Sequence, residues 1–481
     1  MAINCSFLLV LLLSTVLHLL LFDCSEKVEA YRFGKMTENL KFQSHVVSLS
    51  SLIPAEFCST SDQGSKISSK LLQVTHKHGP CSPLNEGNAK IPSLHQILMD
   101  DQTRVKSIHS KISKKNKKVA DSKVKLPAKS GESLGTGNFI VQVGFGTPKQ
   151  DFTLVFDTGS DLTWIQCQPC AGQCYSQQDP IFDPSASSTY SNISCRSTTC
   201  AELKSATGNA RSCSNTCTYQ VVYGDSSYSG GNFATDTLTL SSSDVFPNFE
   251  FGCGENNQGL FGSADGLLGL GRDRISTVSQ TAYKYRKLFS YCLPSKSSST
   301  GYLAFGTEAG ASSGTQYTPL LTESRNPSFY FLTMTGISVA GKKLSISPSV
   351  FTTSGTLIDS GTVITRLAPA AYSKLSSAFR EAMSQYPPAP AYSILDTCYN
   401  LAGFSTVSIP TIELYFGGGT GLNVAPSGIL VQASPIQYCL GFAENSDASD
   451  VAILGNLQQQ TFEIVYNVDG GKLGFKAGAC S

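Results

Sequence analysis

Apolar residues that alternate with polar ones recur along the last two-thirds of the chain and predict β-strands. The segment 138–146, Asn-Phe-Ile-Val-Gln-Val-Gly-Phe-Gly, alternates and then breaks at Gly-Thr-Pro. Similar strand patterns occupy residues 217–223, 232–240, 329–339 and 461–466. Helical spacing is clearest at 370–383, and a short amphipathic helix is expected near 92–112. Because Gly, Pro, Asn and Asp fill the turns throughout, the pattern predicts an all-β fold with few short helices.

Two of the apolar runs end in nearly the same turn. One reads Phe-Thr-Leu-Val-Phe-Asp-Thr-Gly-Ser and ends at Ser160; the other reads Gly-Thr-Leu-Ile-Asp-Ser-Gly-Thr and ends at Thr362. Their aspartates, Asp157 and Asp359, are 202 residues apart, about the length of one domain. An apolar-apolar-Gly run closes each half, at 267–269 and 453–455. This order predicts a duplicated domain.

The repeated turn also carries candidate chemistry. A single Asp-Ser/Thr-Gly turn is common in a chain rich in Ser and Gly, whereas two copies, each after a strand and one per half, are a specific signal. Two carboxylates brought face to face cannot both ionise, so the pair holds an acid and a base together. All six histidines precede residue 110: His18, His45, His76, His78, His95 and His109. The globular part therefore cannot build a Ser-His-Asp or Cys-His pair or a His-ligated zinc site.

These motifs resemble those of the pepsin-like aspartic proteases over residues 136–481, most closely the plant nepenthesin-type branch. The segment 71–81 resembles the branch named for a chloroplast nucleoid DNA-binding protease. The resemblance implies a bilobal pepsin-like acid protease fold, with two β-barrel-like lobes and a central cleft. It implies Asp157 and Asp359 as the catalytic pair. The residues that it implies as support for the pair are Thr158, Gly159, Ser160, Ser360, Gly361 and Thr362, and those of the flap are Tyr223 and Gly224, with Trp164 bracing Tyr223 through its indole N–H.

The function expected from the dyad is an aspartic endopeptidase that hydrolyses peptide bonds at acid pH. The two carboxyls would activate a water, and no cofactor or metal is expected. The expected partners are polypeptide substrates, pepstatin-type inhibitors and the chain's own prosegment, and the protein is expected to be a monomer. A non-catalytic binding protein similar to the cereal xylanase inhibitors is the alternative.

Cysteine usage indicates an oxidising compartment. Of 16 cysteines, four precede residue 82 and twelve follow residue 166, an even number that suggests six disulfides. The spacing of Cys167, Cys170 and Cys174 leaves zinc as an alternative. Pairing cannot be deduced from the spacing, but the resemblance implies a Cys398–Cys439 bridge. The twelve cysteines are Cys167, Cys170, Cys174, Cys195, Cys200, Cys213, Cys217, Cys253, Cys292, Cys398, Cys439 and Cys480.

The N-terminus predicts a secreted protein. Residues 7–22 are mostly apolar, too few for a membrane span and typical of a signal-peptide core, which predicts a signal peptide over 1–30. No later segment is apolar enough to span a bilayer. We expect an apoplastic or other extracellular destination, or the vacuole; a chloroplast address rests on the named relative alone. Asn192 begins the glycosylation sequon Asn-Ile-Ser.

Charge divides the chain into a basic and an acidic part. Residues 1–130 carry a net charge of +8, and residues 131–481 carry −7. We predict a basic prosegment over 31–129, an N-terminal lobe over 130–315 with the Cys-rich insertion and the flap, and a C-terminal lobe over 316–481. The Lys-rich stretch 111–125 suggests a prosegment in which a lysine blocks the dyad until acid releases it. A solvated linker and DNA binding through phosphates remain alternatives for this stretch.

Overall fold

The apolar runs form strands that bury both of their faces near the predicted turns. The structure, a computed structural model, describes residues 43–53, 57–59, 71–85, 92–114, 139–207, 212–223, 227–259, 261–310, 313–323 and 326–480. Strand β4 (Gln150–Asp157) is buried without a break from Phe152 onward. A strand covered on both faces loses the apolar–polar alternation, which explains the continuous apolar run before Asp157.

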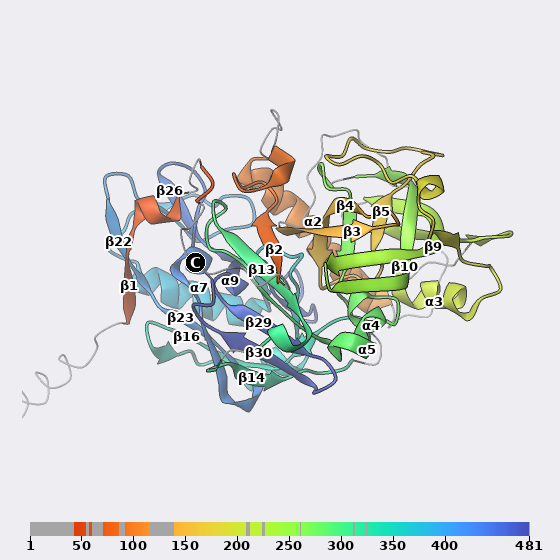
Figure 1. Ribbon diagram of the computed structural model, residues 1–481. Helices are drawn as coiled ribbons and strands as arrows, with labels where there is room; N and C mark the ends of the chain where they lie inside the picture. Colours follow the sequence, from red (N-terminus) through yellow and green to blue (C-terminus); the bar gives the residue numbers. More distant parts are fainter. Residues whose placement is uncertain are drawn as a thin grey trace, which may run out of the picture. The chain divides into compact units, whose positions relative to one another are not determined.

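The largest sheet contains strands from both halves of the chain and from the predicted prosegment. Strand β2, at residues 71–76, pairs with β13 on one side and with β3 on the other (Figure 1). In order across the sheet, the strands are β14 (Gln316–Pro319), β30 (Lys472–Lys476), β29 (Glu463–Asn467), β12 (Leu288–Cys292), β13 (Thr300–Phe305), β2 (Leu71–His76), β3 (Phe139–Phe145), β4, β11 (Gly266–Gly269), β5 (Trp164–Gln166), β10 (Asp244–Gln258), β9 (Tyr228–Ser241), β8 (Cys217–Val222) and β7 (Ser212–Cys213), with β6 (Ser191–Asn192) beside β9.

The remaining strands lie in smaller sheets formed mainly by the second half. The sheet that carries the second aspartate turn consists of β15 (Phe331–Leu332), β18 (Thr356–Ile358), β28 (Ala452–Leu454), β19 (Thr365–Leu367) and β27 (Phe442–Glu444). The others are β17 (Lys342–Lys343), β16 (Met334–Val339), β23 (Ile412–Phe416) and β24 (Thr420–Asn423); β20 (Pro388–Ala389), β21 (Cys398–Asn400), β26 (Gln437–Leu440) and β25 (Leu430–Gln432); and β1 (Ser44–Ser48) with β22 (Thr406–Pro410). The strand expected over 329–339 is thus divided into β15 and β16.

The duplication expected from sequence is present in the strand pairing. In the first half, β11 runs parallel to β4 and antiparallel to β5, and β10 runs parallel to β5. In the second half, β28 runs parallel to β18 and antiparallel to β19, and β27 runs parallel to β19. The two apolar-apolar-Gly runs are therefore the strands β11 and β28, each beside an aspartate-bearing strand.

Two longer helices follow the expected apolar spacing. Helix α7 (Pro369–Ala382) begins with proline, whose fixed φ suits the first helical turn, and buries Tyr372, Leu375 and Phe379. Helix α2 (Leu94–Lys114) buries Leu98, Val105 and Ile108. The shorter helices are α3 (Thr198–Thr207), α4 (Thr277–Gln280), α5 (Ala282–Tyr285), α6 (Pro348–Thr352), α8 (Pro426–Ile429) and α9 (Asn456–Gln459).

The described residues from His45 onward belong to one compact unit. The predicted signal peptide, the Lys-rich residues 115–125 and the joint at 126–135 lie outside the described residues. Within the described part of the chain, no helix is both long and apolar enough to cross a membrane.

Candidate active site

The two aspartates lie at corresponding places in the duplicated sheets. Asp157 ends β4, opposite Gly269 of the parallel strand β11, and its carbonyl accepts a hydrogen bond from Leu270 N (2.9 Å). Asp359 follows β18, and its backbone N–H donates to Leu454 O of β28 (3.2 Å). Each aspartate thus leaves its strand beside an apolar-apolar-Gly strand, which holds both turns in the same local geometry.

The residues after the two aspartates lock the turns to each other. Thr158 N donates to Ser360 Oγ (3.1 Å), and Ser360 N donates to Thr158 Oγ1 (2.9 Å). All of these groups are buried, so each hydroxyl satisfies a backbone N–H that has no access to water. The exchange explains why a hydroxyl residue, Thr or Ser, follows each aspartate.

Each turn also places a glycine against the carboxylate of the other turn. A Cβ added at Gly159 would lie 2.8 Å from Asp359 Oδ1, and one at Gly361 would lie 2.7 Å from Asp157 Oδ1. Neither position has room for a side chain, because real Cβ atoms do not approach an oxygen so closely. The glycines therefore permit the two carboxylates to face one another.

The cation that lies between the carboxylates is Arg104 of helix α2. Its Nη2 is 2.7 Å from Asp157 Oδ1 and 2.9 Å from Asp359 Oδ2, and its Nε donates to Asp359 Oδ2 (3.1 Å). The Arg104 side chain is 13% exposed, and both aspartates are essentially buried. A single guanidinium thus bridges both aspartates, using the fork of donors that makes arginine suited to carboxylates.

This contact corrects the expectation that a lysine of the stretch 111–125 blocks the pair. A compact ammonium cannot donate from two nitrogens at once, whereas the guanidinium does. The sequence contained a signal for it: Asp101 and Arg104 stand within the apolar stripe of α2 formed by Leu98, Val105 and Ile108. A charged residue on the buried face of a helix requires a buried partner of opposite charge.

The carboxyl groups have unequal acidity. Burial raises the pKa of Asp157, but the Arg104 charge and hydrogen bonds from Arg104 and Gly159 outweigh it, so the net pKa lies below its usual value. At Asp359, burial together with the nearby Asp157 charge outweighs Arg104, and the pKa is raised. The pKa of Arg104 is lowered by burial, but the two carboxylates raise it above its usual value overall. The pKa values of the two aspartates move apart because two like charges share one buried site.

The two expected hydroxyl supports differ in their contacts. Thr362 Oγ1 donates to Asp359 Oδ2 (2.6 Å). Ser160 Oγ and Asp157 Oδ2 are both buried without a partner of good hydrogen-bond geometry among the described residues. The Ser160 hydroxyl nevertheless lowers the pKa of Asp157 as a nearby donor. Thr362 thus holds its carboxylate directly, and Ser160 acts at longer range.

The flap residues adjoin the first half of the site. Tyr223 lies at the end of the hairpin formed by β8 and β9, where its N–H donates to Ser227 O (2.8 Å). Trp164 is fully buried, and its Nε1 donates to Tyr223 Oη (2.8 Å), the contact that the resemblance implies. Phe261 packs edge-on against both rings. Gly224 lies outside the described residues.

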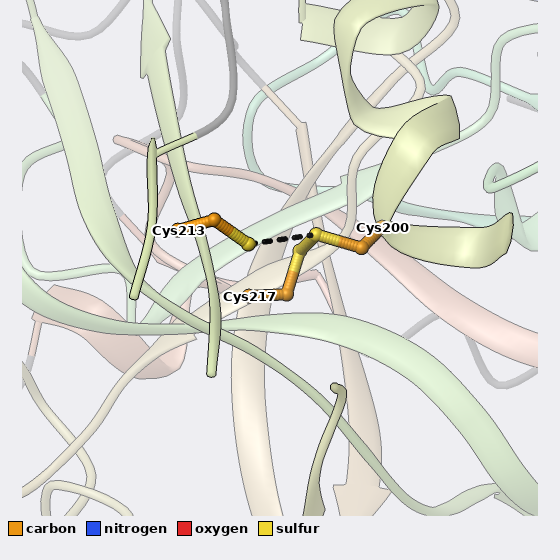
Figure 2. Close-up of side chains that lie close together, drawn as sticks. All are labelled: Cys200, Cys213 and Cys217. Atoms are coloured by element: carbon orange, nitrogen blue, oxygen red, sulfur yellow. Dashed lines mark hydrogen bonds between the residues drawn. A yellow bond between two sulfur atoms is a disulfide. The ribbon is translucent and has the colours of Figure 1, made fainter. Parts of the chain in front are cut away.

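The cysteines are joined in disulfides rather than in a metal site. Cys200, Cys213 and Cys217 are close together, with their ligand atoms within 4.8 Å of one another (Figure 2). All three, however, form disulfide bonds, so none has a free thiolate that could bind a metal. The zinc alternative at Cys167, Cys170 and Cys174 fails for the same reason. The pairs are Cys58–Cys81, Cys167–Cys253, Cys170–Cys174, Cys195–Cys213, Cys200–Cys217, Cys292–Cys480 and Cys398–Cys439, the last being the pair that the resemblance implies. The sequon residue Asn192 is exposed on β6.

Known proteins are similar to this chain in sequence and in fold. The xylanase inhibitor N-terminal and C-terminal family models match residues 139–307 and 329–477. An aspartyl protease family protein of Arabidopsis thaliana is 53% identical over 91% of this chain and 93% of its own length. Nepenthesin-2 of Nepenthes gracilis, an aspartic proteinase, is 39% identical over 72% of this chain and 78% of its own.

Among solved structures, basic 7S globulin from soybean shares the fold, with a TM-score of 0.57 at 20% identity over 72% of this chain and 92% of its own. The sequence relatives carry the stronger argument, because they are much more similar and span most of the chain. The protein therefore belongs to the pepsin-like aspartic proteases of plants and is an aspartic-type endopeptidase that acts on polypeptides.

Proposed function

We propose that the chain is a secreted acid endopeptidase made as an inactive precursor, in which Arg104 occupies the catalytic pair until helix α2 leaves. The observation that carries the proposal is the bridge from Arg104 to both aspartates at 2.7–3.1 Å. A guanidinium at that place excludes a water that the carboxyls could activate. Seven disulfides in the described residues support synthesis along an oxidising secretory route.

The reaction follows from the unequal carboxyls once Arg104 has gone. The ionised carboxylate takes a proton from a water held between the pair as the water oxygen attacks the amide carbon. The protonated carboxyl gives its proton to the carbonyl oxygen, which forms a neutral tetrahedral intermediate. The C–N bond then breaks as the amine nitrogen accepts a proton from the dyad. In the precursor, the pKa of Asp157 is lowered and that of Asp359 is raised, so Asp157 is the more acidic of the two.

Acid weakens the block through Asp157. Its pKa is depressed in the precursor, so the ion pair with Arg104 is fully formed above the usual pKa of a carboxyl, about 4, and is lost as the pH falls through the lowered value. Low pH therefore weakens the attachment of α2 to the dyad.

The direct test is to incubate the folded precursor from about pH 3 to about pH 7 and to assay cleavage of an unfolded protein with and without pepstatin. We expect acid-dependent, pepstatin-sensitive cleavage that is absent from Asp157→Asn. Absence of cleavage by folded protein that has lost its prosegment would favour the alternative, a non-catalytic binding protein like the xylanase inhibitors that name the matching family models.

The proposed destination is the apoplast or the vacuole. A carboxy-terminal fluorescent fusion, followed by amino-terminal sequencing of the mature protein, tests it. Plastid import of the fusion would contradict this part of the proposal and leave the protease activity untouched.

A further inference from the structure

Helix α2 makes a second buried ion pair beside the one at the dyad. Asp101, three residues before Arg104, has its carboxylate 2.8 Å from Arg366 Nη2 of β19. Its two oxygens also accept hydrogen bonds from the backbone N–H groups of Val363 (2.6 Å) and Ile364 (3.2 Å). Both charged side chains are 1% exposed or less. Asp101 thus fills a socket made of one guanidinium and two backbone donors.

The socket belongs to the loop of the second catalytic aspartate. Val363 directly follows Thr362, which holds Asp359 (2.6 Å), and Arg366 lies three residues further on. On α2, Asp101 and Arg104 are three residues apart, a rise of about 4.5 Å. The carboxylate socket and the catalytic carboxyls therefore lie side by side, and one helix occupies both.

Departure of α2 leaves the socket with an unsatisfied cation. Arg366 Nη2 loses Asp101 and also Gln102, whose Oε1 it contacts at 3.3 Å. The contact that remains is Nη1 with Ile364 O (2.8 Å), and the buried Arg366 Nε has no partner among the described residues even in the precursor. The guanidinium and the two N–H groups then lack the carboxylate that they bind in the precursor, and their arrangement favours another carboxylate in its place.

We propose that in the active enzyme Arg366, with the N–H groups of Val363 and Ile364, binds a carboxylate side chain of the polypeptide substrate. An extended substrate advances about 3.3 Å per residue, so the rise along α2 between Asp101 and Arg104 places the preferred Asp or Glu within about two residues of the scissile bond. This specificity rests on the proposed function, because the socket opens only when the prosegment leaves.

The test compares quenched-fluorescence peptides that are identical except for Asp or Asn at each of the two positions on either side of the scissile bond. The peptides are amidated at the carboxyl terminus, so the varied Asp side chain is their only carboxylate. A separate comparison uses a peptide with neutral side chains and a free carboxyl terminus. Near pH 5.5 we expect kcat/KM to favour Asp about ten- to hundred-fold at one position. Near pH 3 the preference falls toward one, because the substrate carboxyl takes up a proton.

Two variants assign the preference to the socket. In Arg366→Gln we expect the Asp-to-Asn ratio to fall to about one, while Arg380→Gln, which removes an exposed arginine of α7, keeps the wild-type ratio. If Arg366→Gln does not fold, the pH dependence of the wild-type ratio decides by itself.

Equal rates on Asp and Asn peptides at every position, a ratio unchanged in Arg366→Gln, or a preference confined to the free terminal carboxylate would overturn the subsite. In each of these cases the neutral peptide is still cut, so the proposed function stands. Cleavage of no peptide by folded enzyme that has lost its prosegment instead contradicts the proposed function, and the subsite with it.

Discussion

In the proposed precursor, single side chains decide whether the dyad is open or closed. Arg104 of α2 contacts both aspartates through Nη2, and it contacts Asp359 through Nε as well. The turns beneath the dyad depend equally on single atoms, because Thr158 Oγ1 and Ser360 Oγ each accept the other turn's N–H. Loss of one guanidinium changes access to the site, whereas loss of one hydroxyl changes its rigidity.

Replacing Arg104 with Met should release the block without shortening the chain. Truncating one member of a buried ion pair costs about 3–5 kcal/mol. In this variant, the loss weakens the binding of α2 to the rest of the protein. We expect the uncut Arg104→Met precursor to bind pepstatin and to cleave peptides at least about tenfold faster than the uncut wild type. Lys106→Met, which changes an exposed cation of the same helix, serves as control. An Arg104→Met precursor as inactive as the wild type would contradict the blocking role.

Replacing Thr158 with Val keeps the side-chain shape and removes the acceptor for Ser360 N. A buried N–H left without a partner costs about 1–3 kcal/mol, so urea unfolding of the mature enzyme should show a loss of that size, together with reduced kcat. Thr352→Val, at an exposed threonine of α6, should change stability by less than about 0.5 kcal/mol. Equal effects of the two substitutions would show that the exchange between the turns is dispensable.

Among the structural elements, strands β1 and β2 and helix α2 hold the predicted prosegment to the enzyme. Strand β2 is an inner strand of the large sheet, paired with β13 and β3, and α2 carries Arg104. The disulfide of this region, Cys58–Cys81, closes within the prosegment, so it forms no covalent tie to the mature part. Release therefore depends on non-covalent contacts, and those of His76 in β2 change with pH.

The pKa of His76 is lowered to about 4, first by burial and then by the charge of Lys77. The released segment takes up a proton near the ordinary histidine pKa of about 6.5, so between about pH 6.5 and 4 the free form binds more protons. The stability that neutral His76 gives to the attachment of β2 is complete above that pH range, and it is lost as the pH falls through the range. The mildly acid range should therefore loosen β2 before Asp157 is protonated.

We predict that His76→Phe keeps the prosegment attached to lower pH, by about 0.5–1 unit. Phenylalanine preserves the edge-on packing against Phe139 and cannot be protonated. The measurement is size-exclusion chromatography across pH, after the precursor is cut at a protease site introduced between residues 126 and 135. His95→Phe, at an exposed position of α2, is the control. Release at the same pH in all three proteins would exclude His76 as a contributor.

Across the whole molecule, the duplicated sheets and the disulfides bring together residues that are far apart in the chain. Cys292 and Cys480 are 188 residues apart and join β12 to the C-terminal end, whereas Cys170 and Cys174 close a loop only 4 residues apart. The entropy of the unfolded chain falls more when a longer loop is closed. The long bridge should therefore stabilise the enzyme more than the short one does.

The double variant Cys292→Ser/Cys480→Ser should lose up to about 5 kcal/mol of unfolding free energy, and Cys170→Ser/Cys174→Ser about 2 kcal/mol. Denaturant unfolding of the mature enzymes under non-reducing conditions checks the order. A larger loss from the short loop would show that local packing, rather than chain entropy, governs these bridges.

The sequence by itself determined the features that are written locally. The repeated Asp-Thr/Ser-Gly turns, the strands that carry them, the duplication and helix α7 follow from short-range periodicity and turn chemistry, and the parity of the cysteines indicated disulfides. Flap contacts and the Cys398–Cys439 bridge came from the resemblance, since spacing alone does not specify a partner.

Only the tertiary structure decided which distant groups meet. It paired Arg104 with Asp157 and Asp359, and Asp101 with Arg366. It also set the partners of the described cysteines other than Cys398 and Cys439. The lysine expectation was wrong because charge density along the chain does not reveal which cation faces the core; the orientation of α2 and the geometry of the guanidinium do. Contacts of this kind join residues up to 265 positions apart. Their free energy arises only when folding removes both partners from water, which no local pattern records.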